Sequence, residues 1–390
     1  MPSFLTVIAA LCALLAVAGT VYFALCIWAA QQFRRELSQA VRTHFSPPVS
    51  ILRSLKGLDP QMYLAFRTHC LLDYGEYEVL FGVSDDNDPA LDLVKRLQEE
   101  FPLRQLQVVH CPKVLGLNGK VSNLAQMLPQ ARYEHIVIND SDIVVPRDYL
   151  QHVMAPLAKP DVGMVTTLYR GIAGTTIGAK LEALGLSADF MGGVLVARTL
   201  QGVRFALGGT IATTKTVLAA IGGLEPLAEY LSDDYELGAR TAAAGYRVEL
   251  ADTMVETTVP DYTFGEFWTH QTRWARTVKA CRPAEYFGLI VTFALVWALL
   301  GVAAAPHAWW PWLVLAVAAI MRFTSAVVVG RGVLRDPQVL RDLWLLPLRD
   351  LVALAVWIVS YFGNEIEWRG QRFRLRKGKL ESSKAENRKS

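Results

Sequence analysis

The stretch His135-Ile136-Val137-Ile138-Asn139-Asp140-Ser141-Asp142 carries two carboxylates one residue apart, directly after a short strand-like run. The run is typical of a buried strand, so we expect Asp140 and Asp142 at the carboxyl end of a sheet, where α/β proteins bind ligands. Two carboxylates in this position can hold a hard divalent cation, Mg2+ or Mn2+, that also binds substrate phosphates. Taken alone, the stretch favours the simpler alternative, a loop turn capped by the aspartates.

Around this stretch, strand-like and helical segments alternate over residues 47–280, which predicts one layered α/β domain. The predicted strands cover residues 49–52, 77–83, 106–109, 135–138 and 163–167. Amphipathic spacing predicts helices at residues 60–72, 91–101, 121–127 and 149–158, followed after glycine-rich connections by helices at 217–221 and 234–244.

A long apolar segment precedes the domain. Residues 4–30 contain no charged side chain, and 27 residues of helix extend roughly 40 Å, enough to cross a bilayer. No cationic region precedes the segment, so we interpret it as a membrane anchor and not a cleaved signal. Arg34, Arg35 and Arg42 follow it, and the positive-inside rule therefore places the domain in the cytoplasm.

A second membrane-like region, residues 284–363, follows the domain. Residues 287–304 and 309–330 are typical of a helical hairpin. The third segment, 343–363, is interrupted by charged residues and proline, so it either crosses the bilayer or is re-entrant or interfacial. The side on which the basic tail, residues 364–390, lies depends on that choice.

Composition excludes several classes of protein. A net charge of +3 is too small to indicate nucleic-acid binding, and no nucleic-acid partner is expected. The five cysteines are scattered without a CxxC pair, which argues against a disulfide framework or a zinc site.

Four further features have both a chemical and a structural interpretation. Asp85 ends a strand-like run and suits a nucleotide contact, but it also lies in a sequence rich in turn formers. Lys120 opens a helix, where a cation and free N–H groups bind anions, although a solvated lysine is the simpler interpretation. Asp234 begins a helix as either a proton acceptor or a residue favoured by the helix dipole. Arg273 and Trp274 suit a pyrophosphate and a sugar or lipid, or a juxtamembrane anchor.

In this order and spacing, the chain resembles membrane-anchored GT-A glycosyltransferases of family 2 type, whose pattern is D, DxD, (E/D)D and (Q/R)xxRW. It is more similar to ceramide glucosyltransferases and their bacterial relatives that glycosylate hopanoids. The resemblance covers nearly the whole chain. It rests on these stretches: Pro48-Val49-Ser50-Ile51-Leu52, Leu55-Lys56-Gly57, Val83-Ser84-Asp85, residues 116–124, 139–144 and 230–235, Arg273-Trp274 and Trp368-Arg369-Gly370.

The resemblance implies a GT-A-type, Rossmann-like α/β domain with an N-terminal transmembrane helix and C-terminal transmembrane or interfacial helices. It also implies a role for each matching residue. Carried over by position, these are Asp85 as a base or ribose ligand, Asp140 and Asp142 as the metal and diphosphate site, Lys120 as a nucleotide-site cation, Asp234 as the general base, and Arg273 with Trp274 as the diphosphate and acceptor clamp. His270 occupies the first position of the last motif, with Gln271 one residue late.

The implied reaction is an inverting transfer of one sugar, N-acetylglucosamine or glucose, from a UDP-sugar to the hydroxyl of a membrane lipid. A compact alanine-rich chain resembles bacterial proteins, so we expect a multi-pass protein of a bacterial inner membrane with a hopanoid (bacteriohopanetetrol) acceptor. The alternatives are a ceramide glucosyltransferase, a processive polysaccharide synthase and a non-catalytic UDP-sugar-binding membrane protein. The apolar stretch 190–207 either borders the acceptor entrance or is an amphipathic surface element.

Overall fold

A computed structural model describes residues 4–39, 44–59, 61–368 and 371–382. Four predicted features lie outside these residues: Arg42, the first residue of the helix expected at 60–72, the Arg369-Gly370 part of the resemblance, and residues 383–390 of the tail. The chain forms two compact units. The sheet unit comprises residues 40–170, 201–258 and 378–390, and the helical unit comprises residues 1–39, 171–200 and 259–377.

The sheet unit contains a mixed sheet with the strand order β3-β2-β1-β4-β7-β6-β8-β5. Its parallel half consists of β1 (Val49–Ser54), β2 (Tyr77–Val83), β3 (Gln105–His110) and β4 (His135–Ile138). The other half consists of β5 (Ile143–Val144), β6 (Val162–Ala173), β7 (Ile211–Thr214) and β8 (Arg247–Val259). In this half β7 runs antiparallel to both β4 and β6, and β5 runs antiparallel to β8.

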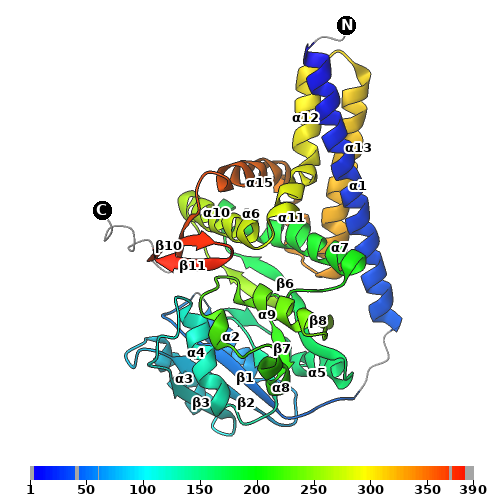
Figure 1. Ribbon diagram of the computed structural model, residues 1–390. Coiled ribbons are helices and arrows are strands. Elements are labelled where there is room, and N and C mark those ends of the chain that lie inside the picture. The colour runs from blue at the N-terminus through cyan, green and yellow to red at the C-terminus, as the bar shows by residue number, and fades with distance from the viewer. Residues whose placement is uncertain (1–3, 40–43, 60, 369–370, 383–390) are drawn as a thin grey trace, which may run out of the picture. The chain divides into compact units, whose positions relative to one another are not determined.

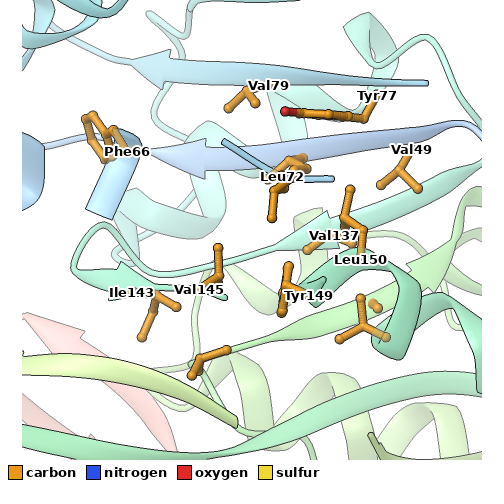
Figure 2. Close-up of a cluster of buried hydrophobic side chains, with 14 of the residues drawn as sticks. Val49, Phe66, Leu72, Tyr77, Val79, Val137, Ile143, Val145, Tyr149 and Leu150 are labelled. Carbon is orange, nitrogen blue, oxygen red and sulfur yellow. The ribbon is translucent and has the colours of Figure 1, made fainter. Parts of the chain in front are cut away.

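The helices of the sheet unit follow the strands in α/β order (Figure 1). They are α2 (Met62–Cys70), α3 (Ala90–Glu100), α4 (Gly119–Met127), α5 (Tyr149–Met154), α8 (Lys215–Ala220) and α9 (Asp233–Ala243). Figure 2 shows the apolar core, to which β1, β2 and β4 contribute Val49, Val79 and Val137. Tyr149 and Leu150 of α5 belong to the same cluster and are fully buried. Burying each such aliphatic side chain contributes about 1.5–3 kcal/mol.

The strand order creates a switch point beside β1. The chain passes from β1 to β2 on one side, and later enters β4 on the other side. All three strands are parallel, so their carboxyl ends meet at one edge, which is where open α/β sheets bind ligands. Asp85 follows β2 and Asp140 follows β4, so both predicted sites lie along this edge.

In the helical unit, α1 (Phe4–Gln39) runs beside α12 (Ala294–Ala304) and α13 (Trp309–Ala326) (Figure 1). Small residues such as Ala16 and Ala294 line their contact. Among the described residues, four helical segments are long and apolar enough to cross a membrane: 4–39, 177–201, 309–333 and 338–360. These helices indicate that the chain is associated with a membrane.

Two predicted segments differ from the structure. The predicted span 287–304 is not one straight helix, because α11 (Pro283–Gly288) and the short helix after it meet α12 at a 52° bend. Phe293, at the break, leaves the helical conformation with φ −84° and ψ 38°. Residues 190–201 of the predicted stretch 190–207 lie in a helical segment that runs from Ile177 to Gln201, and residues 202–207 follow its end.

That segment consists of α6 (Ile177–Gly185), a π-helical turn (Leu186–Phe190) and α7 (Met191–Gln201). The glycines of this segment have low helix propensity, so the sequence pattern did not predict a helix there. The predicted segment 343–363 contains all of α15 (Leu346–Ser360), and whether it crosses the bilayer stays open. The helix α10 (Phe264–Cys281) lies within the predicted domain 47–280 but belongs to the helical unit. The predicted boundaries of the domains at 47–280, 284–363 and 364–390 stay predictions.

Candidate active site

Lys120 lies at the start of α4, where its ammonium group joins two acidic segments of the sheet unit. Its Nζ lies 2.6 Å from Oδ1 of Asp140 and 3.0 Å from Oδ2 of Asp233. Only 8% of the Asp233 side chain is exposed, against 40% for Asp140. The pKa of Lys120 is raised because the nearby carboxylates outweigh the cost of its burial, so the ammonium group is charged. Sequence reasoning gave a role to Asp234 alone, and this contact adds Asp233 to the candidate site.

Asn118 explains how α4 is held against the loop that leads into α9. Its side-chain oxygen accepts a hydrogen bond from the N–H of Val121 and caps the helix. Its side-chain amide donates to the carbonyl of Tyr230 at 2.8 Å, and its backbone N–H donates to the carbonyl of Ala228 at 2.7 Å. Sequence reasoning did not single out Asn118, although an Asn before a helix is a recognised cap signal.

Asp234 begins α9 beside Asp233 and accepts a hydrogen bond from the N–H of Tyr235. A Cβ placed on Gly208 would lie 2.8 Å from Oδ2 of Asp140 and 3.4 Å from Oδ2 of Asp234. The two carboxylates therefore flank a backbone position that has no side chain. Burial, with the charge of Asp233, raises the pKa of Asp234 to about 6. A carboxylate of this kind can accept a proton at neutral pH.

Asp142 lies in the turn after β4, as Asp140 does, but its carboxylate has different partners. The hydroxyl of Thr257 on β8 donates to its carboxylate, and the hydroxyl of Ser141 donates to Asp59 at 2.5 Å. Burial, with the charge of Asp140, raises the pKa of Asp142 to about 6. The turn thus presents two hard oxygen donors, which fit a divalent cation. Within the described ranges no group of three or more His, Cys, Asp or Glu forms a metal site, so such a cation would complete its shell with phosphate or water.

A cluster of buried polar side chains holds the turn that carries Asp140 and Asp142. Arg53, at the end of β1, is fully buried and donates to the backbone carbonyl of Asp140 at 2.8 Å. Its other terminal nitrogen lies 2.7 Å from the ring of His69, whose pKa burial lowers well below its ordinary value. Asn139 donates to the hydroxyl of Tyr149 at 3.0 Å and to the carbonyl of Gly209 at 2.8 Å. These contacts fix the backbone from which both carboxylates project.

Asp85 lies in an exposed turn after β2. Its carboxylate accepts from the N–H of Asn87 at 2.9 Å, and its carbonyl accepts from the N–H of Asp88. This is the turn that the sequence offered as the alternative. The exposed carboxylate still lies at the carboxyl edge of the sheet, and its nucleotide role stays a prediction.

Arg273 and Trp274 lie on α10 in the helical unit. The ring of Trp274 lies 5.2 Å from that of His270 and 6.4 Å from that of Phe190. His270 and Gln271 both turn toward Glu182 on α6, at 3.0 Å and 3.3 Å. Sequence reasoning missed Glu182, because 88 residues separate it from His270.

The sequence matches glycosyl transferase family 21 over residues 11–381. The chain belongs to this family. Ceramide glucosyltransferase 3 of Caenorhabditis elegans is 24% identical over 348 residues, covering 84% of this chain and 73% of the relative. Ceramide glucosyltransferase 1 of the same organism is 23% identical over 358 residues, covering 87% of this chain and 74% of the relative.

The fold has a counterpart among solved structures. A mannosyltransferase from Pyrobaculum calidifontis, solved in complex with GDP-Man and Mn2+, aligns with a TM-score of 0.55 and 20% identity, covering 92% of this chain and 99% of the other. The family 21 chain therefore has a GT-A-type fold and is a glycosyltransferase. Its structure brings Lys120, Asp140, Asp142 and Asp234 to one edge of the sheet. Their individual roles stay predictions.

Proposed function

We propose that this family 21 glycosyltransferase transfers a single sugar from a UDP-sugar to the hydroxyl of a membrane lipid, with inversion at the anomeric carbon. One observation carries the proposal: a partly buried lysine joins the Asp140 turn to the start of α9, so a cation, a carboxylate pair and a candidate base share one edge. Each group has the chemistry that one step of such a transfer requires.

In the proposed reaction, Lys120 and the N-terminus of α4 bind the diphosphate and stabilise the negative charge that develops as it leaves. Asp234 accepts the proton of the attacking lipid hydroxyl, so that the hydroxyl oxygen forms the new glycosidic bond while the bond to the diphosphate breaks. Asp140 and Asp142 would hold a divalent cation, which would supply further charge stabilisation to the diphosphate. Arg273 and Trp274 contact the diphosphate and the acceptor, and Asp85 contacts the nucleotide.

A lipid acceptor is supported by the membrane-type helices and by the named activity of the relatives. Ceramide glucosyltransferases take ceramide as their acceptor, which favours UDP-glucose and a ceramide-like hydroxyl. A hopanoid acceptor with UDP-N-acetylglucosamine, predicted from the sequence, remains the alternative to UDP-glucose and a ceramide-like acceptor. The mannosyltransferase that shares the fold was solved with Mn2+, which supports the choice of a divalent cation.

We place the protein in a bacterial inner membrane with the sheet unit in the cytoplasm. Arg34 and Arg35 at the end of the first apolar segment support this orientation through the positive-inside rule. A nucleotide sugar is then available from the cytosol, and the lipid hydroxyl from the headgroup layer.

The direct test compares lipid extracts from cells with and without the gene by mass spectrometry. The proposal expects one glycolipid to disappear, and the masses of its sugar and lipid distinguish glucosylceramide from a glycosylated hopanoid. A missing polymer would favour the processive synthase instead. Binding of UDP-sugar without turnover on any lipid would favour the non-catalytic alternative.

A further inference from the structure

Glu182, a buried carboxylate with no assigned role, contacts His270 and Gln271, which lie at the start of the last sequence motif. Glu182 of α6 is 5% exposed, and its Oε2 lies 3.0 Å from Nδ1 of His270 and 3.3 Å from Nε2 of Gln271. The side chain of Gln271 is itself 8% exposed. Two side chains of consecutive residues on α10 therefore converge on one oxygen atom of a neighbouring helix.

The contact depends on a close approach of α6 and α10. A Cβ on Gly178 would lie 3.0 Å from Cβ of Phe267, so even alanine at this position would require Phe267 to shift by a few tenths of an ångström. Glu182 lies one turn after Gly178, and His270 lies one turn after Phe267, so the same faces meet again there. Phe267 is fully buried in the apolar cluster that also contains Leu181 and anchors this register.

The carboxylate sets the orientation of His270. An ionised carboxylate only accepts hydrogen bonds, so Nδ1 of His270 is the donor and the ring is fixed about this contact. The ring stacks on Tyr262 with centroids 5.4 Å apart and an interplanar angle of 28°. The His270 ring also lies close to that of Trp274, with centroids 5.2 Å apart. The hydrogen bond from His270 to Glu182 thus supports the ring of Trp274 through one intervening side chain.

We infer that Glu182 is a positioning residue for acceptor transfer: it holds His270 and Gln271, and through His270 it fixes Trp274. The inference rests on the proposed function, in which Trp274 contacts the lipid acceptor. It also explains why histidine stands at the first position of the motif. Histidine, glutamine and arginine share a side-chain N–H that can donate to the Glu182 carboxylate.

The test measures transfer with purified full-length enzyme in lipid vesicles, using a UDP-sugar and the acceptor lipid identified by mass spectrometry. Glu182→Leu and His270→Leu are each expected to lower kcat/KM for the acceptor by about tenfold to hundredfold, because small misplacements of a binding group cost this much. The KM for the UDP-sugar and the slow hydrolysis of the UDP-sugar by water should not change. His270→Gln restores a donor and should recover most of the activity.

The double variant Glu182→Leu/His270→Leu decides whether the two residues act together. The inference expects the double variant to lose no more than the worse single variant. Independent, multiplying losses would overturn it, as would a loss of stability without a change in KM for the lipid. If Glu182→Leu does not fold, the comparison of His270→Leu with His270→Gln decides, and equal activity of these two overturns the inference. Absence of lipid transfer by the wild-type enzyme would instead reject the proposed function itself.

Discussion

Nζ of Lys120 lies 2.6 Å from Oδ1 of Asp140, which connects the start of α4 to the turn after β4. The pair is mostly withdrawn from solvent on the lysine side, with 20% of the Lys120 side chain exposed. A charged pair in such a place is weakly screened by salt, so it fixes the position of both groups. The lysine also reaches Asp233, so that one ammonium group orders both acidic segments of the candidate site.

Replacing Lys120 by methionine should raise KM for the UDP-sugar by roughly tenfold to hundredfold, because a charged hydrogen bond to phosphate is lost. Steady-state kinetics with varied UDP-sugar measure this change. Lys95→Met is the matched control, since Lys95 lies on α3 with 71% of its side chain exposed. An unchanged KM in Lys120→Met would remove Lys120 from the nucleotide site.

Asp142→Asn should weaken activation by Mn2+ or Mg2+, because it removes one of two hard oxygen donors at the turn. We expect a higher metal concentration for half-maximal activity, with less change in activity at saturating metal. Mn2+ binding followed by electron paramagnetic resonance gives the same comparison without turnover. Asp148→Asn, an exposed carboxylate in the same region, is the control. Equal Mn2+ affinity of wild type and Asp142→Asn would argue against a metal role for Asp142.

Acidification should inactivate the enzyme through Asp234 and Asp142, whose pKa values are raised to about 6. Below about pH 6 both carboxyls bind protons, so kcat/KM falls by tenfold per pH unit for each group whose charge is required. Saturating metal competes with protons at Asp142, so at saturating metal only the decrease in kcat/KM caused by protonation of Asp234 should remain. A flat profile from pH 7 to pH 5 would contradict the general-base assignment.

The same two shifts predict the opposite trend for stability. A carboxyl whose pKa is higher in the folded state binds more protons there than in the unfolded chain. These two groups therefore add stability as the pH falls from about 6 toward 4, and remove it as the pH rises through that window. Denaturant unfolding of Asp142→Asn should show a smaller pH dependence than the wild type.

Asn118→Ala should destabilise the protein by about 1–3 kcal/mol, because it removes the cap of α4 and the donor to the Tyr230 carbonyl. It should also raise KM for the UDP-sugar, since Lys120 follows two residues later. Thr214→Ala removes the cap of α8 and serves as control, because α8 carries none of the candidate site residues. If the two variants lose similar stability and neither changes KM, Asn118 has a purely structural role.

The parallel half of the sheet could be predicted because its strands are local apolar runs. The strands 77–83 and 135–138 were predicted to the residue, and α9 within one residue at each end. The strands β7 and β8 were not predicted. The four residues of β7 pair with β4 and β6, strands distant in sequence, and no local pattern reveals that pairing.

The candidate site shows the same division. Lys120, Asp140, Asp142 and Asp234 could be proposed from strand ends and helix starts. The contacts of Lys120 with Asp233 and of Glu182 with His270 join residues about a hundred positions apart, so they appear only once the chain is folded. Arg53, which is fully buried, lay one residue beyond the predicted strand 49–52, and nothing in the local sequence indicated its contact with the Asp140 turn.

In the proposed reaction, Asp234 activates a lipid hydroxyl for attack on a UDP-sugar. The most direct measurement is transfer of radiolabelled sugar from the UDP-sugar into a lipid extract by the wild type, Asp234→Asn and the exposed control Asp252→Asn. The wild type and the control should each yield a divalent-dependent glycolipid of inverted configuration. None is expected from Asp234→Asn, which should still bind the UDP-sugar. Full transfer by Asp234→Asn, or a labelled product that is not a lipid, would contradict the proposed reaction.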